Sequence, residues 1–315
     1  MAYDIIGDIH GHAQTLELLL EELGYSLQQG VYRHPTRRVI FLGDFIDRGP
    51  QQRKVIHIVR PMIDAGAALS VMGNHEFNAI AYSTPKSGGG FLRPHNDHNF
   101  HQHQAFLDAY VDADDYHELL DWFGTLPLWL DLGDLRVVHA CWDQDVIDEI
   151  KSRYDVNGKL SNGLLYAACN YGTWEFLAVE TLLKGKEIKL PDGHSFTDQS
   201  GITRRNIRVR WWDDGVETFR DAFMGDERLR TNIPDDDIHG DHLIEYSHSA
   251  PPCFLGHYWL SNRPAPLSDN IACVDYSVAR KGGRLAAYRW DGETVLSADK
   301  FVTVNAVEHA VATTV

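Results

Sequence analysis

The sequence has few cysteines and no long apolar run, and both absences narrow the class of protein. Its four cysteines, at positions 141, 169, 253 and 273, show no Cys-x-x-Cys spacing, and the first residues lack the charged and apolar stretches of a secretory signal. No apolar run approaches the roughly 20 residues that span a bilayer. These features predict a cytoplasmic protein, in a reducing compartment, that has no membrane partner.

Basic residues are also scarce. The chain carries 29 Lys and Arg against 45 Asp and Glu, which gives a formal net charge of −16. Duplex nucleic acid is bound largely by neutralising its phosphates, so this charge argues against a duplex partner. The 315 residues, 43% of them apolar, suffice for a substantial core. We expect a single domain over residues 1–315, with an insertion at 142–250 that contacts the substrate.

Five short motifs rich in possible metal ligands occur along the chain. In order, they are Gly7-Asp8-Ile9-His10-Gly11, Gly43-Asp44-Phe45-Ile46-Asp47-Arg48-Gly49, Gly73-Asn74-His75-Glu76, His139-Ala140-Cys141 and Gly256-His257-Tyr258. Their carboxylate, imidazole and amide groups suit manganese, iron or zinc without any thiolate. One such pair carries little information, but five together indicate a two-metal hydrolase.

Apolar runs precede the first three motifs, and helical patterns follow the first two. The predicted strands cover residues 3–6, 39–42 and 68–72, and the predicted helices contain the apolar positions of 16–23 and 55–63. Strands that alternate with helices favour parallel pairing, with the motif residues at the carboxyl ends of the strands. The motifs should therefore meet at one edge of a sheet.

The remaining segments are less regular. A hairpin over 128–139 would bring His139 to a strand end, and residues 271–278 and 285–290 are predicted to form two closing strands around residues 281–284. The end of the chain, 305–315, is expected to be a helical or frayed tail.

The segment 85–103 combines a glycine run with four histidines, His95, His98, His101 and His103. The glycine run lacks the lysine and hydroxyl residue of a nucleotide-binding loop, so it predicts a flexible linker. For the histidines, a solvated loop is favoured over a metal or substrate contact, and we assign them no role.

Together the motifs resemble the phosphoprotein phosphatase branch of the calcineurin-like metallophosphoesterases. The last motif, continued by Trp259, also resembles bacterial diadenosine tetraphosphate hydrolases. The resemblance implies an α/β fold, a four-layer αββα sandwich of two central mixed sheets flanked by helices, with the insertion between the fourth and fifth motifs.

The resemblance also implies a dinuclear metal site. The implied ligands are Asp8, His10, Asp44, Asn74, His139 and His257. Asp44 would bridge two divalent ions, most simply manganese, with iron, zinc or a mixed pair as alternatives. A hydroxide shared by the ions would attack the phosphorus.

Three catalytic roles follow from the same resemblance. His75 would donate a proton to the leaving oxygen, Asp47 would orient His75, and Arg48 would bind the phosphoryl oxygens. Relatives carry a second arginine between the last two motifs. The candidates here are Arg204, Arg205, Arg208 and Arg210, with a solvated charged strand as the alternative.

Two activities fit this set of residues. The first is a phosphomonoesterase that acts on phosphoserine, phosphothreonine or small phosphate esters, and the second is a dinucleoside polyphosphate hydrolase. The second would need stacking surfaces for adenines, for which Trp174, Trp211 and Trp212 are candidates, although aromatic residues often form a small core. A phosphodiesterase or nuclease is disfavoured by the acidic balance and by Asp47 and Arg48. A catalytically silent, metal-bound scaffold that recognises phosphorylated partners is disfavoured because every ligand and the acid are present.

Overall fold

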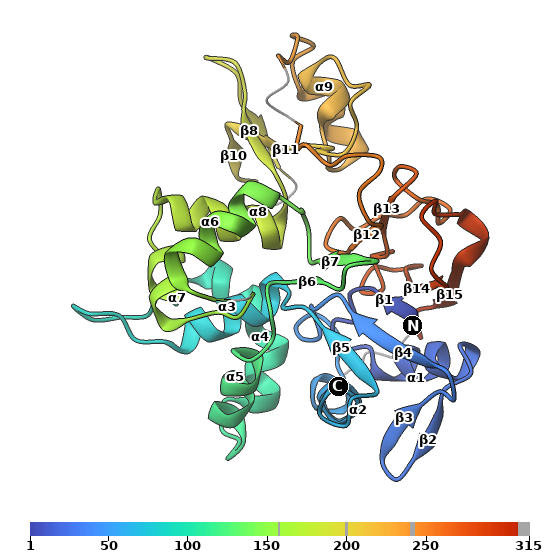
Figure 1. The fold of residues 1–315 in the computed structure, drawn as a ribbon. Helices are drawn as coiled ribbons and strands as arrows, with labels where there is room; N and C mark the ends of the chain where they lie inside the picture. Colours follow the sequence, from blue (N-terminus) through green and yellow to red (C-terminus); the bar gives the residue numbers. More distant parts are fainter. Residues whose placement is uncertain (157, 199–200, 240–242, 308–315) are drawn as a thin grey trace, which may run out of the picture.

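The first three motif loops leave the carboxyl ends of three neighbouring parallel strands (Figure 1). The computed structural model describes residues 1–156, 158–198, 201–239 and 243–307. Within them, the first sheet has the order β15 (Phe301–Asn305), β14 (Arg284–Trp290), β1 (Ala2–Ile6), β4 (Arg37–Phe41) and β5 (Ala68–Ser70). Strands β1, β4 and β5 are parallel, as predicted, while β14 and β15 add antiparallel.

The last two motif loops leave a second sheet in the same way. In the described residues this sheet has the order β13 (Ile271–Cys273), β12 (Cys253–Leu255), β7 (Arg136–Val138) and β6 (Trp129–Asp131). The predicted hairpin is confirmed as the antiparallel pair β6 and β7, and β12 runs parallel to β7. His139 and His257 therefore emerge from the carboxyl ends of adjacent strands.

The two sheets pack face to face through a core of branched and aromatic side chains. Ile5 and Ile40 of the first sheet share one buried cluster with Val137 and Phe254 of the second. Burial of each such side chain contributes about 1.5–3 kcal/mol. The close packing holds the two sets of motif loops beside each other.

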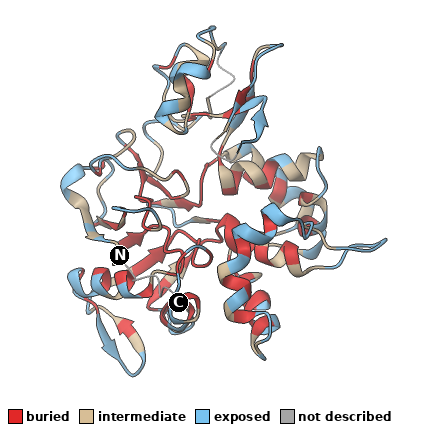
Figure 2. Cartoon of the chain, turned by 180° about the vertical axis from the view of Figure 1, so that it is seen from behind, coloured by how far each residue is buried: buried red, intermediate tan, exposed pale blue. Residues whose placement is uncertain are grey.

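Helices cover the outer faces of both sheets, so the predicted αββα order is confirmed (Figures 1 and 2). Helices α1 (Ala13–Glu22) and α2 (Gln52–Asp64) lie against the first sheet, with Leu16 and Leu19 buried as the spacing predicts. The second sheet's outward Val138 and Leu255 share a buried cluster with Leu182. The remaining helices of this part are α3 (Asn74–Ser83), α4 (Asp97–Tyr110), α5 (Tyr116–Phe123), α6 (Gln144–Tyr154), α7 (Asn162–Ala168) and α8 (Trp174–Lys184).

Part of the predicted insertion has a small core of its own. It contains β8 (Glu187–Lys189), β9 (Phe196–Thr197), β10 (Thr203–Arg204), β11 (Asn206–Arg208), α9 (Phe219–Ala222) and η1 (Glu227–Asn232), the uppermost part of Figure 1. Ile207, Val209 and Phe223 are buried in this cluster. Helices α6 to α8, by contrast, pack on the main core. The division of the chain at 142–250 remains a prediction.

Several segments differ from the sequence-based expectation or were not foreseen. The two expected closing strands lie in different sheets, because β13 ends at Cys273 and the chain then turns towards β14. Strand β15 and the hairpin of β2 (Ser26–Gln28) and β3 (Val31–Arg33) were not predicted, nor was the short η2 (Ala298–Lys300). Most of the predicted tail, from residue 308, lies outside the described residues.

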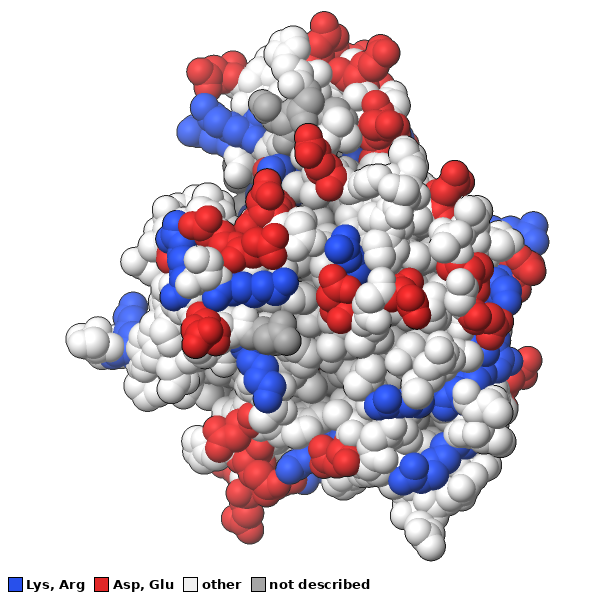
Figure 3. Space-filling model, in the orientation of Figure 1, with Lys and Arg blue, Asp and Glu red and all other residues white. Residues whose placement is uncertain are grey.

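Two surface features bear on possible partners. On the face seen in Figure 3, basic and acidic side chains are interspersed. No helix among the described residues is long and apolar enough to cross a membrane.

Candidate metal centre

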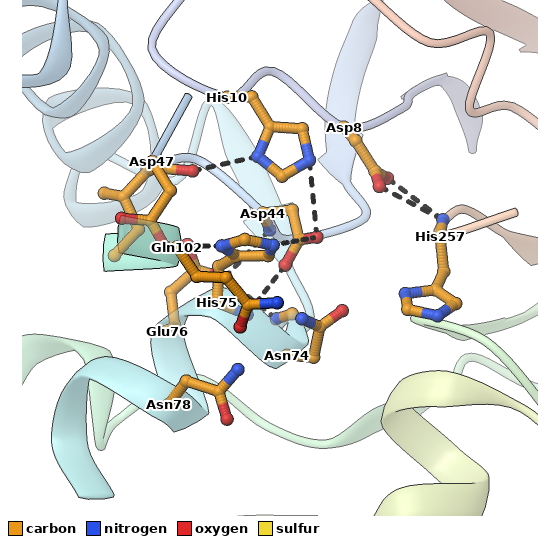
Figure 4. Close-up of polar contacts among 12 residues, drawn as sticks. Asp8, His10, Asp44, Asp47, Asn74, His75, Glu76, Asn78, Gln102 and His257 are labelled. Carbon is orange, nitrogen blue, oxygen red and sulfur yellow. Dashed lines mark hydrogen bonds and ion pairs between the residues drawn. The ribbon is translucent and has the colours of Figure 1, made fainter. Parts of the chain in front are cut away.

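Asp44 lies at the centre of the converging loops (Figure 4). Its Oδ2 is 3.6 Å from Nε2 of His10 and 3.4 Å from Nε2 of His139. Two groups of possible ligands share this carboxylate, with all ligand atoms of a group within 4.8 Å of one another. The groups are His10, Asp44 and His75, and Asp44, His139 and His257. This position is the one expected of a residue that bridges two ions.

Asp8 and Asn74 complete the set of residues that the sequence singled out. The backbone N–H of His257 faces both carboxylate oxygens of Asp8, at 3.1 and 3.3 Å. The Asn74 side-chain oxygen lies 3.2 Å from Nε2 of His139. The structure thus brings all six predicted ligands into one buried region, from five different loops.

The loop backbones are strained where these side chains converge. His10, Asp44 and His257 have φ angles of 45°, 52° and 67°, in the left-handed region that few residues other than glycine adopt. A Cβ on Gly256 would collide with the Asp8 carboxylate. Such geometry persists only where surrounding packing enforces it, so the fold holds these ligands in place.

Backbone carbonyls orient two of the histidines. Nδ1 of His10 lies 2.9 Å from the Ile46 carbonyl oxygen, and Nδ1 of His139 lies 2.6 Å from that of Leu42. If each Nδ1 donates its proton, each Nε2 presents a lone pair to the centre. In the part of the chain that the structure describes, the buried Nε2 of His10 has no hydrogen-bond partner.

The electrostatics of the site suit cations. Burial, together with the nearby Asp275, raises the pKa of Asp8 well above its usual range. For Asp44 burial acts in the same direction, but His139 and His75 outweigh it and hold its pKa well below the usual range. Clustered buried carboxylates are costly without positive partners, and divalent ions would supply them. The donor set therefore fits two ions of the borderline class.

Glu76 ties two ligand loops together, a role that the motif alone did not reveal. Its carboxylate accepts hydrogen bonds from the backbone N–H groups of Asp44 and Phe45, both at 2.8 Å, and of Gly73 at 3.0 Å. The contact with Gly73 is the return half of a capping box at the start of α3. In the sequence, this capping role was indicated only by the presence of a glutamate three residues after Gly73.

Asp47 contacts two histidines at once. One carboxylate oxygen lies 2.5 Å from Nδ1 of His75, the predicted partner, and the other lies 2.8 Å from Nδ1 of His103. These bonds outweigh burial and lower the pKa of Asp47 to about 2. A carboxylate that stays ionised in this way can hold both imidazole rings.

The expectation of a solvated histidine loop is wrong for His103, which is 3% exposed and lies on the buried face of α4. His95, His98 and His101 are exposed, as expected, although the ring of His95 also stacks between Tyr82 and Phe91. The missed signal was helical spacing, since His103 precedes Phe106, Leu107 and Tyr110 by three, four and seven residues.

Arg48 lies over an aromatic ring at the edge of the site. Its guanidinium is 4.0 Å from the ring centroid of Trp259, a residue for which the sequence suggested no role in the site. The same ring lies 5.8 Å from that of His10. Trp259 thus positions a cation beside the metal-ligand cluster.

Of the predicted second arginines, Arg208 approaches the site. Its aliphatic stem and the Tyr258 hydroxyl both lie close to Gly185. Burial, together with the charge of Arg208, lowers the pKa of His257 well below its usual range. Arg205 is exposed between β10 and β11, and Arg210 is partly exposed beyond β11. Neither has a side-chain contact with the ligand cluster among the described residues.

The three tryptophans considered as stacking surfaces have different environments. Trp211 is fully buried, and its indole N–H donates to the Tyr258 hydroxyl at 3.1 Å, so it belongs to the core. Trp212 is partly exposed beside Tyr258. Trp174 begins α8 and stacks against Arg153.

Residues 1–277 match the family model of the calcineurin-like phosphoesterases, and the chain belongs to this family. It is 31% identical over 141 residues to the asymmetrical bis(5′-nucleosyl)-tetraphosphatase PrpE of Oceanobacillus iheyensis. The matched residues make up 44% of this chain and 55% of that protein. The PrpE of Bacillus subtilis is 46% identical over 76 residues, 24% of this chain and 31% of the relative. The chain thus spans about half or less of the length of these relatives.

Two solved structures share the fold. A protein serine/threonine phosphatase from Saccharomyces cerevisiae has a TM-score of 0.54 at 15% identity, covering 99% of this chain and 82% of that one. A cold-active protein tyrosine phosphatase from a psychrophilic Shewanella has a TM-score of 0.50 at 14% identity, covering 96% and 80%.

Proposed function

We propose that this protein hydrolyses phosphoester bonds with the help of two divalent metal ions. The observation that carries the proposal is the position of Asp44, whose carboxylate is shared by two groups of possible ligands, all of them buried except the partly exposed His257. Asp8 and His10 would hold one ion, Asn74, His139 and His257 the other, and Asp44 both. When bound, the ions would polarise the phosphoryl group and lower the pKa of the attacking water.

The leaving oxygen needs a proton donor, and His75 is the group that we assign to this task. Its Nδ1 is held by Asp47, so the proton on Nε2 is directed towards the substrate. His75 also lies in one group of possible ligands with His10 and Asp44, but its Nε2 is 3.9 Å from Asp44, the longest of the three histidine contacts. That spacing supports an acid beside the metals rather than a ligand.

Arg48 would bind the oxygens of the transferred phosphoryl group. Stacking on Trp259 leaves its planar N–H groups available at the ring edge, and a guanidinium matches phosphoryl oxygens in geometry and charge. As negative charge develops during the reaction, such a contact strengthens.

Two substrate classes follow from this chemistry. Phosphomonoesters, including phosphoserine and phosphothreonine peptides, require only the metal cluster, His75 and Arg48. Dinucleoside polyphosphates are the second candidate, because the curated relatives quoted above are named as tetraphosphatases.

The metals and the compartment are also matters of proposal. Carboxylate, imidazole and amide donors support manganese, with iron, zinc or a mixed pair as alternatives. Free thiols at all four cysteines suit the reducing cytosol.

Asp44→Asn is the decisive variant. We expect it to lose both bound metal and turnover, because one change removes a charge that both ions share. The manganese-loaded wild type and variant would be compared on a phosphothreonine peptide and on diadenosine tetraphosphate, with metal content measured alongside. Asp64→Asn is the matched control, since Asp64 is an exposed carboxylate whose ion pair, among the described residues, is with Arg60 on α2. A D44N protein with full activity and normal metal content would refute the proposed site.

A further inference from the structure

A second arginine, Arg93, lies near the site on the side of His75. Its guanidinium donates one hydrogen bond to Oδ1 of Asn78, at 3.1 Å, and one to Oε1 of Gln102, at 2.9 Å. Both partners are neutral amides. Within the described ranges, no carboxylate lies within ion-pair distance of this guanidinium. Its charge is therefore held in place but has no anionic partner.

Two elements of the site hold this arginine. Asn78 lies one helical turn after Asn74 on α3, so the two side chains share a face. Gln102 directly precedes His103, whose ring contacts Asp47. In Figure 4, Asn78 lies beyond His75 and Asn74, on the side away from His10. Because Arg93 is bonded to Asn78, its charge lies on the same side of the site as Asn78, whereas Arg48 stacks on Trp259 beside His10.

The charge of Arg93 also interacts electrostatically with Asp47 of the candidate site. Arg93 is half-buried, and burial lowers its pKa, while Glu180 and Asp47 act in the opposite direction. A guanidinium in such a position gains most from an anion that can reach its remaining N–H groups. Gln102 is exposed and Asn78 is partly exposed, so the approach from solvent is open.

The backbone around Arg93 is well anchored. Its N–H donates to the carbonyl of Ala81 at 2.9 Å, and the next turn is closed by a bond from Asn99 to the Pro94 carbonyl at 2.8 Å. Between these two contacts in the chain, the ring of His95 stacks on Tyr82 and Phe91. A cation supported in this way binds an anion without first having to become ordered.

We propose that Arg93, supported by Asn78 and Gln102, binds a phosphate of the leaving group, so that the preferred substrates are phosphoanhydrides such as nucleoside polyphosphates. The inference rests on the proposed function, because it places the leaving group beside His75. A neutral alcohol, the leaving group of a phosphopeptide, offers no anion at this position.

The reaction adds one water across a P–O–P bridge. A bond forms between the water oxygen and one phosphorus, and the bond from that phosphorus to the bridging oxygen breaks. The bridging oxygen leaves with the electron pair as a terminal oxygen of the second phosphate and can accept the proton of His75. Arg93 would offset the negative charge on that second phosphate.

The test compares Arg93→Gln with wild type on two substrates, diadenosine tetraphosphate and a phosphothreonine peptide. We expect R93Q to lower kcat/KM about thirtyfold or more on the dinucleotide and less than about threefold on the peptide. Arg93→Lys should restore part of the dinucleotide activity, because it keeps the charge. Arg33→Gln, on the distant β2–β3 hairpin, is the matched control and should change neither.

A second variant guards against a folding defect in R93Q. Gln102→Glu changes an exposed side chain and would pair Arg93 with a carboxylate, so it should produce the same selective loss without removing the arginine. Inhibition of p-nitrophenyl phosphate hydrolysis gives a separate readout. Pyrophosphate should inhibit the wild type more strongly than phosphate does, and both variants should reduce this preference.

The outcomes separate the two claims. If wild type hydrolyses the peptide but not the dinucleotide, or if R93Q loses both activities equally, the inference on Arg93 is wrong and the proposed hydrolase remains. If the metal-loaded wild type hydrolyses neither substrate nor p-nitrophenyl phosphate, the proposed function fails, and the inference fails with it.

Discussion

Asp47 is the residue through which two histidines are coupled. One carboxylate oxygen of Asp47 contacts Nδ1 of His75 and the other contacts Nδ1 of His103, and all three side chains are buried. Removing His103 would leave one oxygen of a buried carboxylate without its partner and free Asp47 to rotate. We therefore expect His103 to act as a positioning residue, through Asp47, on His75, the proposed proton donor.

At this scale we predict that His103→Ala lowers kcat by about 10–100-fold, the usual cost of losing a supporting hydrogen bond of this kind. KM and metal content should change little, because no predicted ligand is touched. His103→Asn should recover part of the loss, since its amide N–H can replace Nδ1. His101→Asn, on the exposed face of α4, is the control. A loss of bound metal in H103A would instead point to a structural role.

Single residues also show which positions the local sequence specifies. Asp8, Asp44 and Asn74 each follow a strand by two to four residues, so their positions depend on local sequence and on parallel pairing alone. Arg93 and Trp259 have no such local signal. Their roles depend on contacts with segments far away in the chain, and those contacts are visible only in the folded protein.

Among the elements, the start of α3 joins the second and third ligand loops. The Glu76 carboxylate accepts three backbone N–H groups, two from the loop after β4 and one from Gly73. A glutamine at this position would direct an N–H group at backbone donors. The two loops would then lose their common anchor.

We therefore predict that Glu76→Gln lowers the free energy of unfolding by about 2–4 kcal/mol, as expected when hydrogen bonds to a buried charged group are lost. Urea unfolding measures this change directly. Glu118→Gln on α5 is the comparison, because Glu118 is exposed and should change stability by no more than about 0.5 kcal/mol. Equal stability of E76Q and wild type would contradict the anchoring role.

The edge of the first sheet carries a second element-level feature, an acidic group held by two cations. Lys300 and Arg37 lower the pKa of Asp291, at the end of β14, to about 2 from an ordinary 3.8. Because the folded pKa is depressed, Asp291 contributes stability above pH 3.8, and this contribution is lost as the pH falls towards 2.

The expected effect of Asp291 is small, below about 1 kcal/mol, because its side chain is 47% exposed and solvent screens the charges. Asp291→Asn should make the free energy of unfolding depend less steeply on pH between about 4 and 2. Denaturant unfolding at several pH values would measure the slope. An unchanged slope in D291N would show that the ion pairs add nothing.

For the whole molecule, the candidate metal centre lies where both sheets and five loops meet, so metal binding and stability should be linked. If the ions bind the folded chain there, free metal at about one hundred times Kd would add about 2.7 kcal/mol to the free energy of unfolding. We predict that a chelator lowers the midpoint of thermal unfolding and that excess manganese restores it. Asp44→Asn should remove most of this response, whereas an identical shift in D44N would place the stabilising metal elsewhere.

The small core within residues 187–238 also depends on how distant segments of the molecule pack. The sequence suggested a solvated charged strand around Arg208 and Arg210, but not that Ile207 and Val209 would pack with Phe223 in a separate cluster. Such packing arises between segments that share no local pattern. For the same reason the sequence could name several arginines and could not select Arg208 among them.

The sequence by itself determined the family, the two-sheet fold and the six candidate metal ligands, because each ligand follows a strand end in a short motif whose chemistry is local. Tertiary structure alone decided the surroundings of those ligands. Glu76, His103, Trp259 and Arg93 act through partners on other elements. Hydrogen bonds and burial between distant segments follow from how the sheets and helices pack, and neither spacing nor composition encodes that packing residue by residue.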